Sequence, residues 1–221
     1  MLSFSQFIKE GVNDPAIFKA VFLAGGPGSG KSFIVGKTAL KSLGFKLVNS
    51  DMAFERALAK AGLKANPENI YSPRGQELRA GAKALTGKML ENYINGRLGL
   101  VIDGTGKDYA KIEKQANRLR ELGYEVAMIF VNTDLKTALE RNRKRSRSLP
   151  DSEVKSMWKD VQKNLGKFQN LFRQKMLIVD NSTGSNYEGA TQSTYKRIMS
   201  WSKQKPETRI ANSWIKAQKK L

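Results

Sequence analysis

The sequence predicts a three-layer α/β fold in which a parallel five-stranded sheet carries helices on both faces. Five short apolar runs have the length of buried strands, and segments with helical spacing lie between them. Strands that alternate with helices join through right-handed crossovers, which makes their sheet parallel. The expected strands are 18–24, 45–48, 98–102, 126–131 and 176–179.

Helical spacing of apolar residues supports two of the connecting helices. One apolar face repeats every three or four residues through Ile112, Ala116, Leu119 and Leu122. A second pattern begins at Leu135 and continues into charged residues. Hydrophobic residues make up 40% of the chain, with 10 Phe and 3 Trp, which is enough for a sizeable core.

The composition excludes several chemistries. The 221-residue chain contains no cysteine and no histidine, so it has no disulfide scaffold, thiol nucleophile, histidine base or zinc finger. Lys and Arg number 39 against 20 Asp and Glu, a net charge of +19. This excess favours a polyanionic partner, nucleic acid first and an anionic membrane surface second, although a basic surface also serves solubility.

The sequence also bears on location. No run approaches the ~18–20 apolar residues of a transmembrane helix, and the N-terminus lacks the basic and apolar regions of a signal peptide. We therefore expect no membrane partner and a cytoplasmic protein, in the host cytoplasm if a phage encodes it. The sequence does not indicate an oligomeric state.

A glycine-rich loop follows the first strand directly. Residues 25–32, GGPGSGKS, fit the phosphate-binding pattern G-x-x-x-x-G-K-[ST], with a strand before and a helix after. Glycines let successive backbone N–H groups turn inward around an anion, and the following helix points its positive end at the same phosphates. We expect Lys31 to reach the β- and γ-phosphates of ATP and Ser32 to ligate Mg²⁺. The expected nucleotide contacts are Gly26, Pro27, Gly28, Ser29, Gly30, Lys31, Ser32 and Phe33.

Other motifs favour a small phosphotransferase among the proteins that carry such a loop. A GTPase would need an Asn-Lys-x-Asp motif on a late strand, and the sequence has none. A motor ATPase usually has two acids at the end of an apolar strand, whereas the run 98–102 ends in the single acid Asp103. The last strand leads into Asn181, in a segment placed to lie beside the nucleotide base.

Two carboxylates follow strands of the predicted sheet. Asp51 comes after the second strand, whose end opens onto the crevice beside the phosphate-binding loop in a doubly wound sheet. There it either accepts the proton of an attacking hydroxyl or caps the helix that begins near Met52. Asp103, after the third strand, can hold Mg²⁺ through water, bind the acceptor or cap the turn that follows it.

The segment 140–147 holds four arginines and one lysine in eight positions. Like charges repel each other there until a polyphosphate arrives, and planar arginines can clamp its oxygens in pairs. We expect a lid at about 134–150 that closes over ATP, with Arg141 among its nucleotide contacts and one arginine stabilising the transferring phosphoryl group. The alternatives are a solvated basic face and a nucleic-acid contact unrelated to catalysis.

Together these residues resemble the P-loop polynucleotide 5′-kinase group, of which the zeta-toxin kinases are relatives. The resemblance covers about 21–179 and is closest at 141–145 and 154–159, which look like the lid and following helix of a phage polynucleotide kinase domain. It implies ATP-dependent phosphorylation of a hydroxyl. It also implies that Asp51 is the general base, that Arg145 is the lid arginine at the transferring phosphate, and that Asp103 lies on the acceptor side.

The resemblance is weaker on the acceptor side. Arg56 stands near the family's acceptor-phosphate arginine, but at a longer spacing from Asp51. Arg74 lies in the segment 66–98, which has no counterpart in the family, and is a further candidate for substrate binding. The acceptor is a 5′-hydroxyl end, a hydroxymethylated base within DNA or, as in zeta toxins, a nucleotide-sugar. A non-catalytic nucleic-acid-binding protein with a vestigial loop is the other alternative.

The chain divides into an N-terminal leader or helix (1–17), a kinase domain (18–194) and a basic helical tail (195–221). The leader either docks on the core or resembles the capsid-targeting leaders of phage internal head proteins, with cutting after Ile8-Lys9-Glu10 and a place in the virion interior beside DNA. The tail holds eight Lys/Arg and one acid, with a break expected near Pro206. Its Trp201 and Trp214 either stack on unpaired bases or pack on the sheet.

Overall fold

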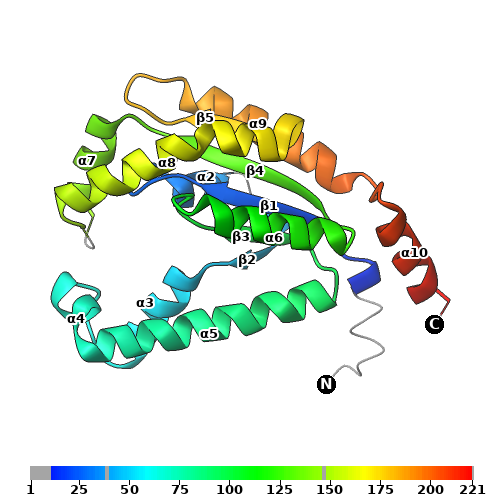
Figure 1. The fold of residues 1–221 in the computed structure, drawn as a ribbon, viewed down its shortest axis with the longest axis horizontal. Helices are drawn as coiled ribbons and strands as arrows, with labels where there is room; N and C mark the ends of the chain where they lie inside the picture. Colours follow the sequence, from blue (N-terminus) through cyan, green and yellow to red (C-terminus); the bar gives the residue numbers. More distant parts are fainter. Residues whose placement is uncertain (1–10, 38–39, 146–147, 221) are drawn as a thin grey trace.

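Five parallel strands form the central layer of the molecule (Figure 1). The computed structural model describes residues 11–37, 40–145 and 148–220. The strand order is β2-β3-β1-β4-β5, and every neighbouring pair is parallel. Each strand overlaps one of the predicted apolar runs, so the predicted sheet is confirmed. The strands are β1 (Lys19–Ala24), β2 (Lys46–Val48), β3 (Leu100–Asp103), β4 (Glu125–Asn132) and β5 (Met176–Asp180).

Helices connect these strands and cover the sheet. The two predicted helical patterns are confirmed as α6 and α7. The α-helices are α2 (Lys31–Lys37), α3 (Ser50–Lys60), α4 (Pro67–Tyr71), α5 (Pro73–Asn95), α6 (Tyr109–Glu121), α7 (Leu135–Arg143), α8 (Asp151–Phe172), α9 (Tyr187–Lys203) and α10 (Arg209–Gln218). Short 3₁₀ helices are η1 (Leu40–Leu43) and η2 (Arg173–Lys175). No helix in the described parts of the chain is long and apolar enough to cross a membrane.

The two faces of the sheet bury separate apolar clusters. On β1, Phe22 belongs to one cluster and Leu23 to the other, because successive side chains of a strand point to opposite faces. The first cluster is completed by residues of α6, α8 and α10, including Phe168. The second is completed by Ile34 of α2 and Ile198 of α9. Helices therefore cover both faces, as predicted, and leave the carboxyl ends of the strands to form a site.

Helices α3, α4 and α5 form a helical lobe, residues 50–95, which lies apart from α7 and α8 in Figure 1. The lobe has its own small core around Phe54 and Leu58 of α3, Ile70 of α4 and Ala82 of α5. Asn66 and Ser72 cap α4 and α5, and each of these helices has a proline in its first turn. The lobe connects β2 to β3, so it stands beside the carboxyl end of β2.

The C-terminal helices are part of the folded body. Helix α9 begins at Tyr187 and runs through the predicted division between 194 and 195, whereas the predicted break near Pro206 is confirmed between α9 and α10. The alternative in which the tryptophans pack on the core is the one observed. Trp214 meets the ring of Phe18 edge-on, with the ring centroids 5.5 Å apart. The predicted leader tripeptide, Ile8-Lys9-Glu10, lies outside the described residues.

A buried carboxylate ties these helices to the sheet. Glu125, the first residue of β4, accepts hydrogen bonds from Lys19 Nζ at 2.8 Å and Lys175 Nζ at 3.1 Å. The same carboxylate accepts the Trp201 indole N–H and the Glu207 backbone N–H, both at 2.8 Å. Burial alone would raise the pKa of Glu125, but these hydrogen bonds and the charge of Lys19 lower it to about 2. Glu125 thus joins β1, β4 and the segment between α9 and α10.

Replacing Glu125 with glutamine is expected to lower the free energy of unfolding by about 3–5 kcal/mol at neutral pH, because Lys19 is left buried without its counter-charge. The lowered pKa stabilises the wild type above pH ~4.5, and that stability is lost as the pH falls towards ~2. The Glu125→Gln variant should lack this pH-dependent contribution to the free energy of unfolding. Urea unfolding between pH 2 and 7 measures both effects. Exposed Glu121, as Glu121→Gln, is the control, and equal stability of the two variants would contradict the role of Glu125.

Candidate active site

The phosphate-binding loop lies between β1 and α2, at the carboxyl edge of the sheet. Its curvature requires glycine at two positions where φ is positive, +76° at Gly28 and +89° at Gly30. A Cβ atom at Gly28 would lie 2.3 Å from the carbonyl oxygen of Ala138, and one at Gly30 would lie 2.3 Å from Asn181 Nδ2. The loop therefore packs directly against α7 and the residue that follows β5. It leads directly into the N-terminus of α2.

Lys31 is the first residue of α2, and its ammonium group lies across the loop. The Nζ atom donates a hydrogen bond to the carbonyl oxygen of Gly25. Burial lowers the pKa of Lys31, while the negative charges of Asp103 and Asp51 act in the opposite direction and the charge of Arg145 adds to the lowering. Lys31 thus lies within electrostatic reach of the other three predicted charges. The arrangement fits a lysine that binds a polyphosphate between an acidic and a basic side.

Asp103 ends β3 and is held by a residue that follows β2. Asn49 donates its side-chain N–H to Asp103 Oδ2 at 2.6 Å, across two neighbouring strands of the sheet. The other oxygen, Oδ1, is buried and has no hydrogen-bond partner. Burial raises the pKa of Asp103, helped by the charge of Asp51 and opposed by Lys31 and by the hydrogen bond from Asn49. One carboxylate oxygen is thus oriented and the other is available to a ligand.

Asp51 lies in the first turn of α3, and it is not the cap of this helix. The capping residue is Asn49, whose side-chain oxygen accepts the backbone N–H groups of Asp51 at 2.8 Å and Met52 at 3.0 Å. The alternative in which Asp51 caps α3 is therefore wrong, because Asn49 already occupies that role. The Asp51 side chain is exposed on the carboxyl side of the sheet.

A pocket of about 420 Å³ opens beside the phosphate-binding loop. Ser32 and Asp103 both line it, as do Asn49 and Met52 on the α3 side. The Ser32 hydroxyl and the free oxygen of Asp103 are hard oxygen donors, the type that Mg²⁺ prefers together with water and phosphate oxygens. The residues therefore fit a Mg²⁺·nucleotide complex. In the described residues no group of three acidic side chains forms a metal cage, as expected for an ion held partly by phosphates.

The predicted lid, 134–150, contains α7 and ends just before α8, and residues 146–147 lie outside the described residues. Asn142, fully buried in α7, makes two hydrogen bonds to Leu149: its Nδ2 donates to the carbonyl at 2.7 Å, and its Oδ1 accepts the N–H at 3.1 Å. Arg143 pairs with Asp151 at the start of α8. These contacts close the base of the segment that carries Arg145, whose side chain is exposed. Trp158 of α8 fixes the segment further by donating to the Thr133 carbonyl at 2.7 Å.

Asn181 is buried and supports the phosphate-binding loop. Its side-chain N–H donates to the carbonyl of Ser29 at 2.8 Å, over 152 residues of sequence. Its own carbonyl accepts the Arg141 guanidinium at 2.7 Å and the Thr133 hydroxyl at 2.9 Å. Asn181 and Arg141, both predicted nucleotide contacts, thus lie together, and Asn181 links the loop to the lid helix.

Replacing Asn181 with alanine is expected to raise the KM for ATP about tenfold, because a buried carbonyl without a partner costs about 1–3 kcal/mol. The loss should fall on nucleotide binding more than on kcat, since Asn181 holds the backbone of the loop. Steady-state kinetics and calorimetric titration with ATP measure the two effects. Asn186→Ala, which removes the cap of α9 close by, is the control. Equal KM values for both variants would contradict this role.

Phe33, on α2, packs against α9. Its exposed ring meets the ring of Tyr187, the first residue of α9, with the centroids 5.9 Å apart. The two rings line a pocket of about 230 Å³ together with polar residues of α9. Spacing along the chain does not connect Phe33 with Tyr187, because the contact joins the helix after β1 to the helix after β5.

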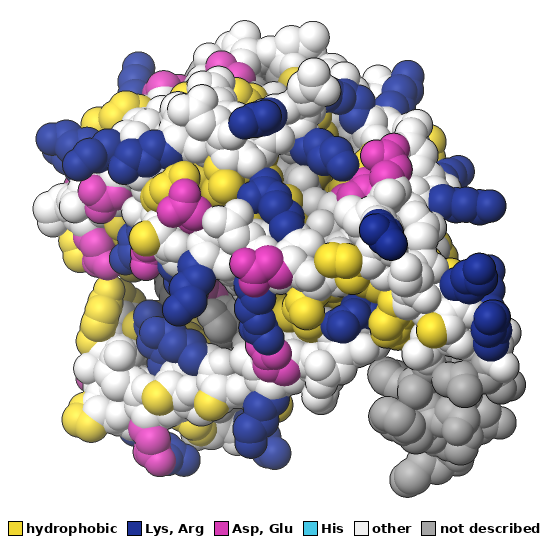
Figure 2. Space-filling view, turned by 45° about the vertical axis from the view of Figure 1, so that its right-hand side comes forward, with side chains coloured by type: hydrophobic (Ala, Val, Ile, Leu, Met, Phe, Trp, Pro, Cys, Tyr) yellow, Lys and Arg dark blue, Asp and Glu magenta, His cyan; other side chains and the backbone are white. Residues whose placement is uncertain are grey.

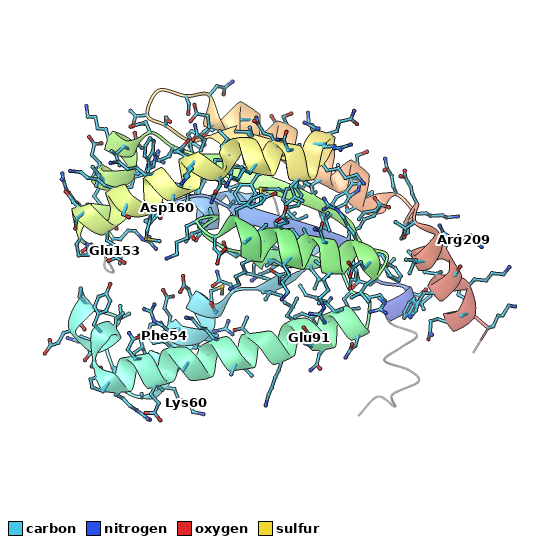
Figure 3. The ribbon with its side chains drawn as sticks, in the orientation of Figure 1. Phe54, Lys60, Glu91, Glu153, Asp160 and Arg209 are labelled. Atoms are coloured by element: carbon cyan, nitrogen blue, oxygen red, sulfur yellow. The ribbon has the colours of Figure 1, made fainter. Side chains whose placement is uncertain are left out.

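The two predicted substrate arginines both lie on the helical lobe. Arg56 is exposed on α3, and Arg74 is exposed at the start of α5, where it pairs with Glu77 one turn later at 2.6 Å. A third arginine of the lobe, Arg79, lies 4.7 Å above the ring of Phe54. Figure 3 shows Phe54 in the lobe and Glu153 on α8, across from it. The Tyr71 hydroxyl donates to Glu153 at 3.4 Å and connects the two sides.

Sequence reasoning missed three asparagine or tyrosine residues of this site: Asn49, Asn142 and Tyr187. Asn49 carried a usable signal, since Asn before a helical segment is a preferred N-cap. Asn142 carried none, because a polar residue between arginines gives no sign of burial. The contacts of Tyr187 are long-range and follow only from the strand order.

The loop, the parallel sheet and the carboxylates at the strand ends define a P-loop nucleoside-triphosphate-binding fold of the kinase-like type. Residues 21–165 match the family model described as an AAA domain, AAA_33, and the chain belongs to this family. A comparison with curated proteins gives no match.

Several solved structures share this fold. A gluconokinase from Sinorhizobium meliloti 1021 superimposes with a TM-score of 0.50 at 14% identity, over 82% of this chain and 94% of that chain. A chain of the AvrRxo1-ORF1:AvrRxo1-ORF2 complex gives 0.57 at 17% identity, over 80% and 61%. A chain of the Pnkp1/Rnl/Hen1 RNA repair complex gives 0.53 at 17% identity, over 68% and 46%. This chain thus spans under half the length of the RNA-repair chain, and at these identities the likeness concerns the fold.

Proposed function

We propose that the protein is a phosphotransferase that moves the γ-phosphate of ATP to a hydroxyl group on a polynucleotide. The observation that carries the proposal is the cluster at the carboxyl edge of the sheet. There Lys31, Asp103 and Asp51 interact around the phosphate-binding loop, and Arg145 reaches the same group from the lid side. A loop that binds phosphate alone would not require carboxylates beside it, whereas transfer to a hydroxyl requires a proton acceptor.

The proposed chemistry uses these side chains in defined roles. Backbone amides of the loop and Lys31 hold the β- and γ-phosphates, and Ser32 is the ligand for Mg²⁺, which neutralises phosphate charge when it is bound. Asp51 accepts the proton of the acceptor hydroxyl as the oxygen–phosphorus bond forms. The bond between the γ-phosphorus and the bridging oxygen breaks, ADP leaves, and Arg145 stabilises the charge on the transferring group.

Asp103 positions the acceptor or the metal in this scheme. Asn49 holds one of its oxygens, and Asp103 lines the same pocket as Ser32. Burial raises the pKa of Asp103, and the negative charge of Asp51 adds to this effect. Asp51, exposed at the start of α3, keeps the role of base.

The polynucleotide acceptor is supported by charge. A net charge of +19 is far more than a small neutral or singly charged alcohol would need for attraction, and it suits a polyanion. The RNA-repair chain with a similar fold is consistent with this choice, whereas the gluconokinase with a similar fold makes a small sugar the alternative to test.

Transfer of labelled γ-phosphate from ATP, with Mg²⁺, to a panel of acceptors tests the proposal. The panel contains 5′-hydroxyl DNA and RNA oligonucleotides, hydroxymethyl-base DNA, UDP-sugars and gluconate. We expect label on an oligonucleotide. Label only on a sugar or nucleotide-sugar would support the phosphotransferase activity and contradict the polynucleotide acceptor. ATP binding without transfer to any acceptor would support the non-catalytic alternative.

A further inference from the structure

We propose that helices α9 and α10 form a docking surface for the phosphate backbone of double-stranded DNA, remote from the phosphate-binding loop. We call it the C-terminal basic surface. It holds eight exposed basic residues and one acid between residues 196 and 220. The basic residues are Lys196, Arg197, Lys203, Lys205, Arg209, Lys216, Lys219 and Lys220. This inference does not depend on the proposed acceptor, because a kinase of any alcohol can carry such a surface.

The basic residues lie on the sides of both helices that face away from the core. On α10, Arg209 and Lys216 are seven residues apart, which places them within about 20° of each other around the helix axis, and Lys220 follows the C-cap of the helix. Ala211 and Trp214 of the same helix turn to the core. Each helix is therefore amphipathic: its apolar side packs on the core, and its basic side is exposed to solvent.

The same pattern holds on α9. Lys196 and Lys203 are seven residues apart and lie within about 20° around the axis, while Ile198 and Trp201 of that helix pack on the sheet. Lys205, in the connecting segment, is exposed as well. Figure 2, which turns the side with α10 forward, shows Lys and Arg side chains projecting along the right-hand side of the molecule.

The surface is rigidly held. The segment between α9 and α10 is fixed to β4 by the hydrogen bond from Glu207 N–H to Glu125 at 2.8 Å and by Thr208 Oγ1, which donates to the Gly123 carbonyl at 2.7 Å. Trp201 donates to Glu125, and the ammonium groups of Lys19 and Lys175 lie 5.1 and 5.6 Å from the centre of its ring. A pre-organised array of cations loses little conformational entropy when it meets a regular polyanion.

The packing of the tryptophans decides which nucleic acid fits. Proteins that bind single strands without sequence preference stack bases on exposed aromatic rings. Between residues 196 and 220 the aromatic side chains are Trp201 and Trp214, and both are engaged with the core. Only phosphate contacts remain, and these are favoured by double-stranded DNA, which carries one charge per about 1.7 Å of axis.

The surface lies at the opposite end of the sheet from the site of transfer. Glu125 begins β4, whereas the phosphate-binding loop follows the last residue of β1, and the two strands are parallel neighbours. Figure 3 accordingly shows Arg209 and Glu153 at opposite ends of the molecule. DNA bound to α9 and α10 therefore leaves the catalytic edge open, and the surface acts as a tether.

Salt titration of binding to a blunt 20-base-pair DNA duplex, without ATP, tests the surface. The variant replaces Lys203, Arg209, Lys216 and Lys220 with glutamine. The control replaces four exposed lysines of the helical lobe, Lys60, Lys64, Lys83 and Lys88, with glutamine and has the same net charge. We expect the surface variant to bind the duplex at least tenfold more weakly at 0.1 M salt. The slope of log K against log salt should fall by about 3–4, near 0.9 for each lost phosphate contact.

Each other outcome would overturn the proposal. Equal losses of duplex affinity in the two variants would mean that binding depends on the net charge and not on the C-terminal basic surface. If a single strand of the same length binds more tightly than the duplex, and the surface variant loses this binding, the ligand is single-stranded nucleic acid and the duplex proposal is wrong. Tighter binding to vesicles with anionic lipid would replace the duplex with a membrane. Because no ATP is present, a failure here says nothing about phosphoryl transfer, and a failure of transfer leaves this measurement valid.

Discussion

Replacing Arg145 with alanine is expected to reduce the kcat of γ-phosphate transfer by about 10³–10⁵-fold, the range found when an arginine that stabilises a transferring phosphoryl group is removed. Arg145 is exposed, yet its charge reaches Lys31 across the phosphate-binding loop. We propose that this guanidinium meets the transferring phosphate when ATP is bound, with a contribution that is larger in the transition state than in the ground state.

Arg143→Ala is the matched control for Arg145, because Arg143 lies on the same segment but pairs with Asp151. Single-turnover transfer and calorimetric ATP binding separate the effects. The ATP affinity of Arg145→Ala should change by less than about tenfold while transfer collapses. If Arg145→Ala keeps at least a tenth of wild-type transfer, or if the control loses as much, the lid arginine has been assigned wrongly.

Replacing Asp51 with asparagine is expected to lower transfer by about 10²–10⁴-fold and to leave ATP binding nearly unchanged. The amide keeps the size of the side chain but cannot accept the proton of the hydroxyl. Helix α3 should remain intact, because Asn49 and not Asp51 caps it. Rapid-quench measurement of a single turnover, together with ATP titration, checks both halves of the expectation.

Glu55→Gln, one turn further along α3, is the control for Asp51. It removes a carboxylate of the same helix without touching the carboxyl edge of the sheet, so its transfer rate should stay near that of the wild type. A large loss of ATP affinity in Asp51→Asn would point to a role in binding the metal. Undiminished transfer would remove Asp51 from the mechanism.

The fold was predictable because it depends on local signals. The apolar runs that became β1 to β5 are short and bounded by glycine or polar residues, and the loop 25–32 ties the first of them to a known chemistry. Once the sheet is parallel, its strand ends meet at one edge, and Asp51 and Asp103 come together without further information.

The supporting residues were not predictable for a physical reason. Asn181 was expected beside the nucleotide base, but its side chain is buried against Ser29, 152 residues earlier in the chain. Asn142 is buried and makes two hydrogen bonds to the backbone of Leu149, seven residues later. Such contacts depend on the spatial order of strands and loops, whereas spacing along the chain reports only on nearest neighbours. The capping of α3 by Asn49 was the one missed contact with a local signal.

The helical lobe has a consequence for how this protein can diverge. Its core around Phe54, Ile70 and Ala82 is closed within residues 50–95, and the chain leaves β2 and returns to β3, two strands that are already paired with each other. The small core of the lobe is therefore separate from the two clusters on the sheet, the first of which α5 joins at its C-terminal end, through Ile94. Evolution can reshape the outer part of this insertion to accept a new alcohol, while Asp51 at the start of α3 and the loop that handles the triphosphate are inherited unchanged.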